Sequence, residues 1–167
     1  MLKSKNDDDI LHARETIKLL ETRKQLVDFA LRLKRDYPDI DFLAYECLDK
    51  CLKKNLVNRN VNKLPKPNAS DNERTNIELV WRRAVAATNI LSIATLSSVK
   101  KHGYLLAMVN QLNDINSIGT GGFERLKKYG FPEFSAEYII RKYYPEKLSE
   151  QHKSKIDLIL KQTNLKI

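Results

Sequence analysis

Residues 84–99 read AVAATNILSIATLSSV and contain no charged side chain. Apolar groups fall on every side of a helical wheel drawn through this stretch, and a helix that is hydrophobic all round is normally buried. A membrane span needs about 20 predominantly apolar residues, whereas this stretch is shorter and carries several Ser, Thr and Asn side chains. We therefore predict a buried central helix here, kinked near Thr88 and Asn89, and no membrane as a partner.

The rest of the chain favours helices around that centre. The chain has 167 residues, of which 42% are hydrophobic, with only five Gly and five Pro. Most of these Gly and Pro residues lie between stretches with apolar side chains at helical spacing, which favours helices over a turn-rich β architecture. We expect an all-α fold: a single compact helical domain of about six or seven helices.

The N-terminal part predicts a long first helix. From Ile10 onward apolar residues recur at three- and four-residue steps up to Tyr37, and Pro38 ends the pattern. Polar residues 22–25 weaken the apolar stripe and are where a break would fall. Either the rest of the chain or a second copy must cover this stripe, so a homodimer through the N-terminal helix is one expected partner.

Composition divides the chain into three parts. Residues 1–56 are expected to form an N-terminal helical arm or hairpin, and residues 57–70, rich in Asn and Pro and free of acid, a basic linker. Residues 71–167 would then form the helical core with basic C-terminal helices.

The excess of positive charge is concentrated in the second two-thirds of the sequence. Residues 1–56 carry 12 Lys and Arg against 11 Asp and Glu, whereas residues 57–167 carry 18 against 10, which accounts for +8 of the net charge of +9. Excess cation on one part of a chain usually faces a polyanion, and nucleic acid is the commonest one.

The segment 122–144 is the best candidate for contacting nucleic acid. It predicts a helix, a turn at Gly130 and a second helix capped by Ser135, which is the outline of a helix-turn-helix. Its second helix would expose Glu137 and two cations rather than an Asn- and Gln-rich face, so an ordinary helical corner stays open. Aromatic residues interleave with the cations and would either stack on unpaired bases or belong to the core.

Other cations could extend this surface. One pair precedes the uncharged stretch, one pair follows it, and three lie in the basic linker; in the alternative interpretation they are solvated helix ends and loops. The predicted nucleic-acid-binding residues are Arg125, Lys127, Lys128, Arg141, Lys142, Arg82, Arg83, Lys100, Lys101, Arg59, Lys63 and Lys66.

Chemistry-bearing motifs are absent from the sequence. The GTGG run at 119–122 lacks the GK[ST] ending of a P-loop, so it favours a connector over a nucleotide site. Cys47 and Cys51 lack the spacing of zinc ligands, the three histidines lie far apart, and no nucleophile motif such as GxSxG occurs. We expect no catalytic residues, no metal and no cofactor.

The cysteines and the N-terminus bear on localisation. Cys47 and Cys51 lie on one face of a helix with poor geometry for a bridge, so they are expected to be reduced. The N-terminal residues lack the apolar region of a secretory signal. A cytoplasmic protein fits these features best.

Together these observations favour a non-enzymatic, nucleic-acid-associated protein, such as a small DNA-binding transcriptional regulator, with DNA a better partner than RNA. The alternative is a helical adaptor or inhibitor that binds an acidic protein, because the same positive charge would steer that association.

Overall fold

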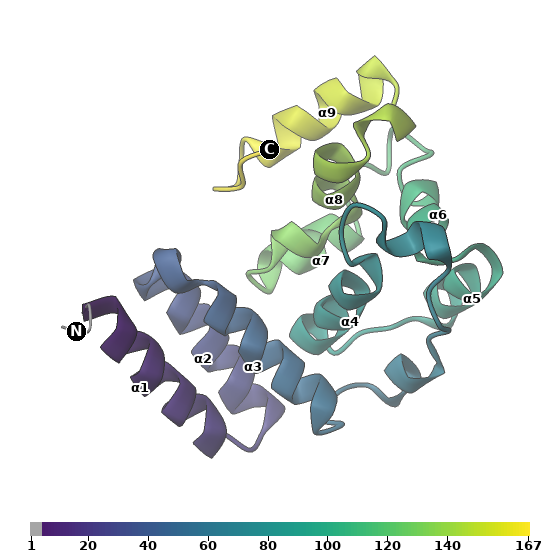
Figure 1. The fold of residues 1–167 in the computed structure, drawn as a ribbon. Coiled ribbons are helices and arrows are strands. Elements are labelled where there is room, and N and C mark those ends of the chain that lie inside the picture. Colours follow the sequence, from purple (N-terminus) through teal and green to yellow (C-terminus); the bar gives the residue numbers. More distant parts are fainter. Residues whose placement is uncertain (1–4) are drawn as a thin grey trace. The chain divides into compact units, whose positions relative to one another are not determined.

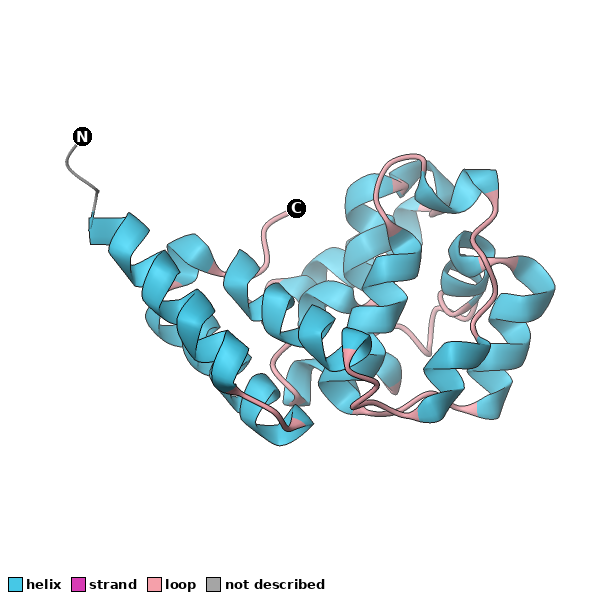
Figure 2. Cartoon of the chain, turned by 60° about the horizontal axis from the view of Figure 1, so that its bottom comes forward, coloured by secondary structure: helices cyan, strands magenta, loops and turns pink. Residues whose placement is uncertain are grey.

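The computed structural model describes the backbone of residues 5–167 and the side chains from residue 7 onward. Within that range the chain forms nine α-helices, five short 3-10 helices and no strand (Figures 1 and 2). The predicted all-α class is confirmed. The chain divides into two compact units, one ending at Asn58 and one spanning Arg59–Ile167.

The first unit holds two helices where the sequence predicts one. Its elements are α1 (Lys5–Leu19), α2 (Arg23–Asp36), η1 (Pro38–Ile40) and α3 (Phe42–Lys53). The Thr22 hydroxyl accepts a hydrogen bond from the Gln25 backbone N–H, and the Gln25 side chain accepts one from the Thr22 N–H. This capping box begins a new helix at the weak point of the stripe, so the prediction of one long N-terminal helix is wrong.

Helix α3 covers the apolar stripe of α1. Ala13 and Ile17 are buried, and α1 packs against α3. The Lys50 ammonium donates to three backbone oxygens at the end of α1, those of residues 17, 18 and 20, at 2.6–2.9 Å. A cation suits the negative end of the helix dipole. Because the stripe is covered within the chain, it no longer calls for a second copy.

The core of the first unit lies between α2 and α3. Leu26, Ala30, Leu43, Cys47 and Cys51 are all fully buried there. Both thiols are free, and burial raises the pKa of Cys47 to about 12 and that of Cys51 to about 11. Since the thiolate is the reactive form of cysteine, these two side chains act as small apolar packing groups.

The second unit contains the other six α-helices of the described chain. They are α4 (Ile77–Thr88), α5 (Ile93–His102), α6 (Tyr104–Asn110), α7 (Gly122–Lys128), α8 (Ala136–Tyr143) and α9 (Glu150–Leu160). Short 3-10 turns lie at Arg59–Lys63 (η2), Ala69–Asn72 (η3), Pro132–Phe134 (η4) and Pro145–Lys147 (η5).

The uncharged stretch is not one helix. Asn89 adopts the left-handed conformation (φ 58°, ψ 23°) and ends α4, and the Ser92 hydroxyl caps α5 three residues later. Asn tolerates that conformation better than most residues with a side chain. The new direction of the chain leaves Ile93 76% exposed. The predicted kink near Thr88 and Asn89 is therefore a full break, and the prediction of a central helix over 84–99 is wrong.

Helix α8 is buried along one face. It packs against α6, α9 and η4. Ala136, Ile139 and Ile140 are buried, and so is the charged residue Glu137. This burial is hard to predict from the sequence because α8 also carries an arginine, a lysine and two tyrosines. The polar ends of these side chains extend past the buried face.

Residues 59–72 pack against the helices of the second unit. The Arg82 guanidinium donates to the Val61 carbonyl, and the Tyr104 hydroxyl donates to the Pro65 carbonyl at 2.7 Å. Buried Asp71 accepts from the backbone N–H groups of Asn68 (2.6 Å) and Leu105 (2.8 Å). These hydrogen bonds hold the basic Asn/Pro segment on the body of the unit instead of leaving it as a free arm.

Candidate polyanion-binding surface

Three of the five cations of residues 122–144 are engaged in the fold, whereas the exposed Arg125 and Lys128 have no ion-pair partner among the described residues. The Arg141 guanidinium forms a two-pronged ion pair with Asp157 of α9 at 2.8 and 3.0 Å. Lys127 lies 3.6 Å from Glu124, and Lys142 donates to the Tyr138 hydroxyl at 2.8 Å while lying over the Tyr143 ring.

The structure gives this segment a helix, a turn and a capped second helix, but not the exposed recognition helix that DNA reading requires. A recognition helix must present its first turns to the groove of DNA. Here Ser135, Ala136 and Glu137 are each at most 6% exposed, and Glu137 accepts a hydrogen bond from the Gly119 backbone N–H at 3.0 Å. The second helix therefore has no free N-terminal face, and the segment is an ordinary helical corner.

Most aromatic residues of the segment are core residues. Phe131 and Phe134 are buried and stack on each other with ring centroids 5.7 Å apart. Tyr144 is 2% exposed, with its ring next to Arg74. Unpaired bases need open ring faces for stacking, and these three rings do not offer them. Tyr129, at 38% exposure, is the most open ring of this group.

The two arginines before the uncharged stretch also have partners. Arg82 is ion-paired with Glu78 at 2.9 Å in addition to its bond to Val61. Arg83 is half-buried and has an interaction partner as well. Both act first as structural residues of α4.

Four exposed lysines on two other segments form a second candidate surface, which we call the basic corner. Lys63 and Lys66 come from the segment before η3, and Lys100 and Lys101 from the last turn of α5. None of the four is ion-paired with any residue in the described part of the chain. Arg59, exposed at the start of η2, flanks them.

The two segments of the basic corner meet at Gly103. A Cβ atom built on Gly103 would lie 2.6 Å from the Asn68 side-chain nitrogen and 3.2 Å from the Asp71 carboxylate. The φ angle of +79° also requires glycine here. Gly103 follows α5 directly, so this close approach brings the chain near Lys66 to the chain near Lys101. Figure 1 shows residues 64–72 running beside α5 and α6.

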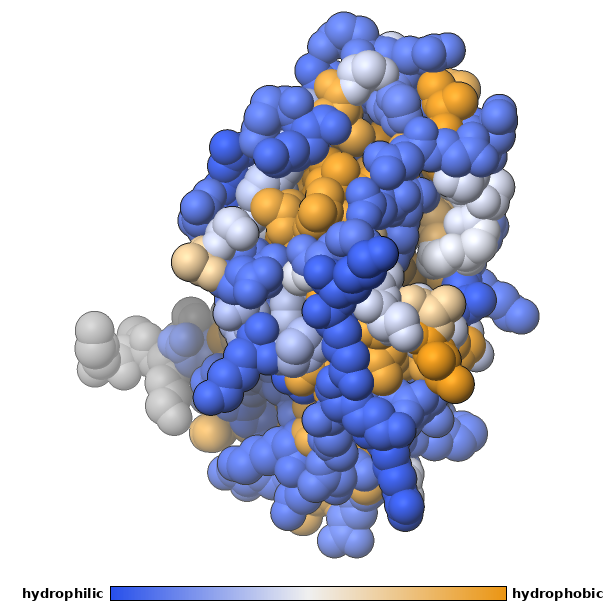
Figure 3. All heavy atoms as spheres, turned by 90° about the vertical axis from the view of Figure 1, so that its right-hand side faces the viewer, coloured by the Kyte–Doolittle hydropathy of each residue, from blue (hydrophilic) through white to orange (hydrophobic). Residues whose placement is uncertain are grey.

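No carboxylate of the described residues is ion-paired with a lysine of the basic corner. Asp71 is 2% exposed and used by two backbone N–H groups, and Glu78 is paired with Arg82. Figure 3 shows the side of the molecule that carries α5 and α6, where hydrophilic side chains predominate and apolar patches lie between them. Exposed Ile93 and Leu106 belong to these two helices.

Sequence reasoning missed the part that Asp71 plays in the basic corner. The signal was present as Asn68 followed three residues later by Asp71, which form a capping box at η3. The additional bond from Asp71 to the Leu105 N–H spans 34 residues, and no local pattern predicts it.

The Gly119–Gly122 loop carries no phosphate cradle. The Gly119 backbone N–H is bonded to Glu137, and a Cβ on Gly119 would collide with Ile159 of α9. The loop is thus a tight connector between α6 and α7. Across residues 5–167 no group of three His, Cys, Asp or Glu side chains could hold a metal ion.

Comparisons with known proteins add no relative: no protein-family model, no curated protein and no solved structure matches the chain. Among the helices that the structure describes, none has the length and apolar character needed to cross a membrane.

Proposed function

We propose that the Arg59–Ile167 unit is a non-enzymatic nucleic-acid-binding module that contacts the phosphate backbone through the basic corner. The observation that carries the proposal is the set of four exposed lysines without ion-pair partners among the described residues, on two segments that buried hydrogen bonds hold together. Lysine acts on phosphates as a point charge and needs no special geometry.

The expected binding mode is phosphate tracking on duplex DNA. Phosphate contacts fix a protein on the duplex without reading its sequence. The helix expected to read bases, α8, is buried along its first turn, so the proposal includes no base-specific contacts. Free, buried thiols at Cys47 and Cys51 suit a reducing compartment, and we place the protein in the cytoplasm as part of the same proposal.

A salt titration of binding to a random-sequence DNA duplex tests this function. Each neutralised phosphate contributes a slope of about −0.9 to the plot of log affinity against log salt. Changing all four lysines of the basic corner to Gln should weaken binding and reduce the slope by about 0.9 for each lysine that contacts a phosphate.

The matched control changes Lys128, Lys147, Lys161 and Lys166 to Gln. These four lysines are exposed, belong to the same unit and have no ion-pair partner among the described residues, so the control removes equal charge from elsewhere. It should change the slope much less than the corner variant. Equal effects of the two variants would show diffuse attraction and contradict a localised site. No binding to duplex or single-stranded DNA at low salt would contradict the function itself and favour an acidic protein partner.

A further inference from the structure

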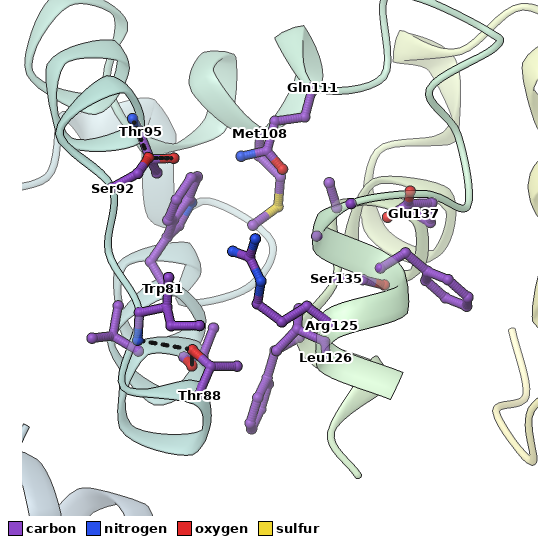
Figure 4. Close-up of a pocket in the computed structure, with 18 of the residues that line it drawn as sticks. Trp81, Thr88, Ser92, Thr95, Met108, Gln111, Arg125, Leu126, Ser135 and Glu137 are labelled. Atoms are coloured by element: carbon purple, nitrogen blue, oxygen red, sulfur yellow. Dashed lines mark hydrogen bonds between the residues drawn. The ribbon is translucent and has the colours of Figure 1, made fainter. Parts of the chain in front are cut away.

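The second unit contains a cavity of about 460 Å³ between α4, α6 and α7. The loop from Ile90 to Ser92, the first turn of α5, the Thr120–Gly122 turn and the start of α8 complete its wall. Small-molecule sites usually have volumes of roughly 300–1,000 Å³, so the cavity is large enough for an organic molecule of modest size. Figure 4 shows Trp81 on one side, Met108 above, and Ser135 and Glu137 on the opposite side.

Two hydrogen-bond donors at this cavity lack partners. Trp81 is 7% exposed, and its indole N–H has no hydrogen-bond partner in the described chain. A buried indole N–H normally finds an acceptor. The Arg125 guanidinium points into the space between Trp81 and Met108 (Figure 4), and no ion pair or hydrogen bond joins it to another described side chain.

The remaining wall is mostly apolar. Its larger members come from α4, the following loop, α6, α7 and η4, and they are Val85, Leu91, Met108, Phe123, Leu126 and Phe134. A ligand for this space should therefore combine an apolar body with a group that accepts hydrogen bonds and balances one positive charge.

Glu137, the acidic member of the wall, does not cancel the charge of Arg125. Its carboxylate accepts from the Gly119 N–H, and no ion pair joins it to Arg125. Burial raises the pKa of Glu137 above its ordinary value. The cavity is thus left with a surplus of donors.

We propose that this cavity binds a small organic monocarboxylate with an aromatic or branched apolar body. The carboxylate would lie against the Arg125 guanidinium and accept from the Trp81 indole N–H, and the body would fill the apolar wall. Arg and carboxylate match in geometry and can form two parallel hydrogen bonds. This site does not depend on nucleic-acid binding, because neither Trp81 nor Arg125 belongs to the basic corner.

The chain supplies its own reporter for a test, since Trp81 is the sole tryptophan. The probes are 3-phenylpropionate and the uncharged 3-phenylpropanamide, which share one body and differ in the anionic group. Titration of the full chain with 3-phenylpropionate should give a saturable change in Trp81 emission, and the amide should bind about tenfold or more weakly, the loss of a charge-assisted bond.

Arg125→Gln should weaken 3-phenylpropionate binding by about tenfold or more and leave binding of the amide unchanged. Lys128→Gln, on the same helix but outside the cavity wall, should change neither. The emission spectrum without ligand reports whether each variant keeps the fold around Trp81. The proposal is overturned by the absence of saturation in the millimolar range, by equal affinity for acid and amide, or by an Arg125→Gln variant that binds the acid as well as the original protein.

Discussion

The basic corner and the α7–α8 segment are both rich in cations but differ in what those cations do. The α7–α8 segment has the denser mixture of cations and aromatic residues, yet Arg141 is paired with Asp157 and Lys142 is held by Tyr138. The lysines of the basic corner stand in plainer sequence and are exposed and unpaired within the described chain. Cations in a sequence therefore predict a binding surface only where they are not already ion-paired or hydrogen-bonded within the fold.

The largest effect should come from removing the buried Asp71 carboxylate, which holds the two segments of the basic corner together. Asp71→Ala leaves the backbone N–H groups of Asn68 and Leu105 without their acceptor. We expect a loss of about 2–4 kcal/mol in the free energy of unfolding, because buried donors lose their partners. Urea denaturation measures this loss.

DNA affinity of Asp71→Ala at low salt gives the second readout. It should fall although no cation has been removed, because Lys63 and Lys66 are then no longer held near α5. Asp71→Asn keeps an acceptor and serves as the control with a smaller loss. Unchanged stability in Asp71→Ala would show that the anchor does not hold the segment.

A smaller effect is expected in the α7–α8 segment, where removing a cation should lower stability and leave DNA affinity unchanged. Arg141→Gln breaks the partly exposed ion pair with Asp157 and should cost about 1 kcal/mol of unfolding free energy. DNA affinity should stay close to that of the original protein, because this cation serves the fold. The contrasting variant, Lys100→Gln, should weaken DNA binding with little change in stability. If the two variants exchanged these phenotypes, the comparison would be reversed.

The buried carboxylate of α8 predicts a pH dependence. Burial raises the pKa of Glu137 in the folded chain above its ordinary value of 4.5, so the folded state binds this proton more tightly than the unfolded state. The resulting stability is fully present below about pH 4.5 and is lost as the pH rises through the raised folded value. Glu137→Gln should remove this dependence and raise stability at neutral pH, as measured by urea denaturation at a series of pH values. A steeper loss of stability with rising pH in the variant would contradict this sign.

The smallest expected effect is the reactivity of the two buried cysteines of the first unit toward a thiol reagent. With pKa values of about 12 for Cys47 and about 11 for Cys51, neither thiol should react with a thiol reagent at pH 8 while the chain is folded. Both should react once urea unfolds the chain. Rapid modification of the folded chain would show that the α2–α3 core opens easily.

Local patterns in the sequence predicted the helical class and many helix ends. The cap at Ser135 follows from a residue type that favours helix starts. The break at Asn89 was underestimated, because the hydrophobic content of residues 84–99 hid a single residue able to adopt the left-handed conformation. The apolar composition of a stretch predicts that it is buried, whereas a single residue such as Asn89 determines where the chain changes direction.

The site could be predicted only in part, for a physical reason. The sequence names every lysine of the basic corner, but its assembly depends on the bond from Asp71 to Leu105 and on the close approach at Gly103. The pairing of Arg141 with Asp157 and the cavity beside Trp81 likewise join residues distant along the chain. Such contacts arise from tertiary packing, and no periodic pattern in the sequence predicts them.

The most direct measurement is the map of backbone amide shifts in isotope-labelled protein on addition of a short DNA duplex at low salt. We expect the perturbed residues to cluster at 59–72 and 100–105, around the basic corner. Perturbation concentrated at 122–144, or in the first unit, would contradict this expectation.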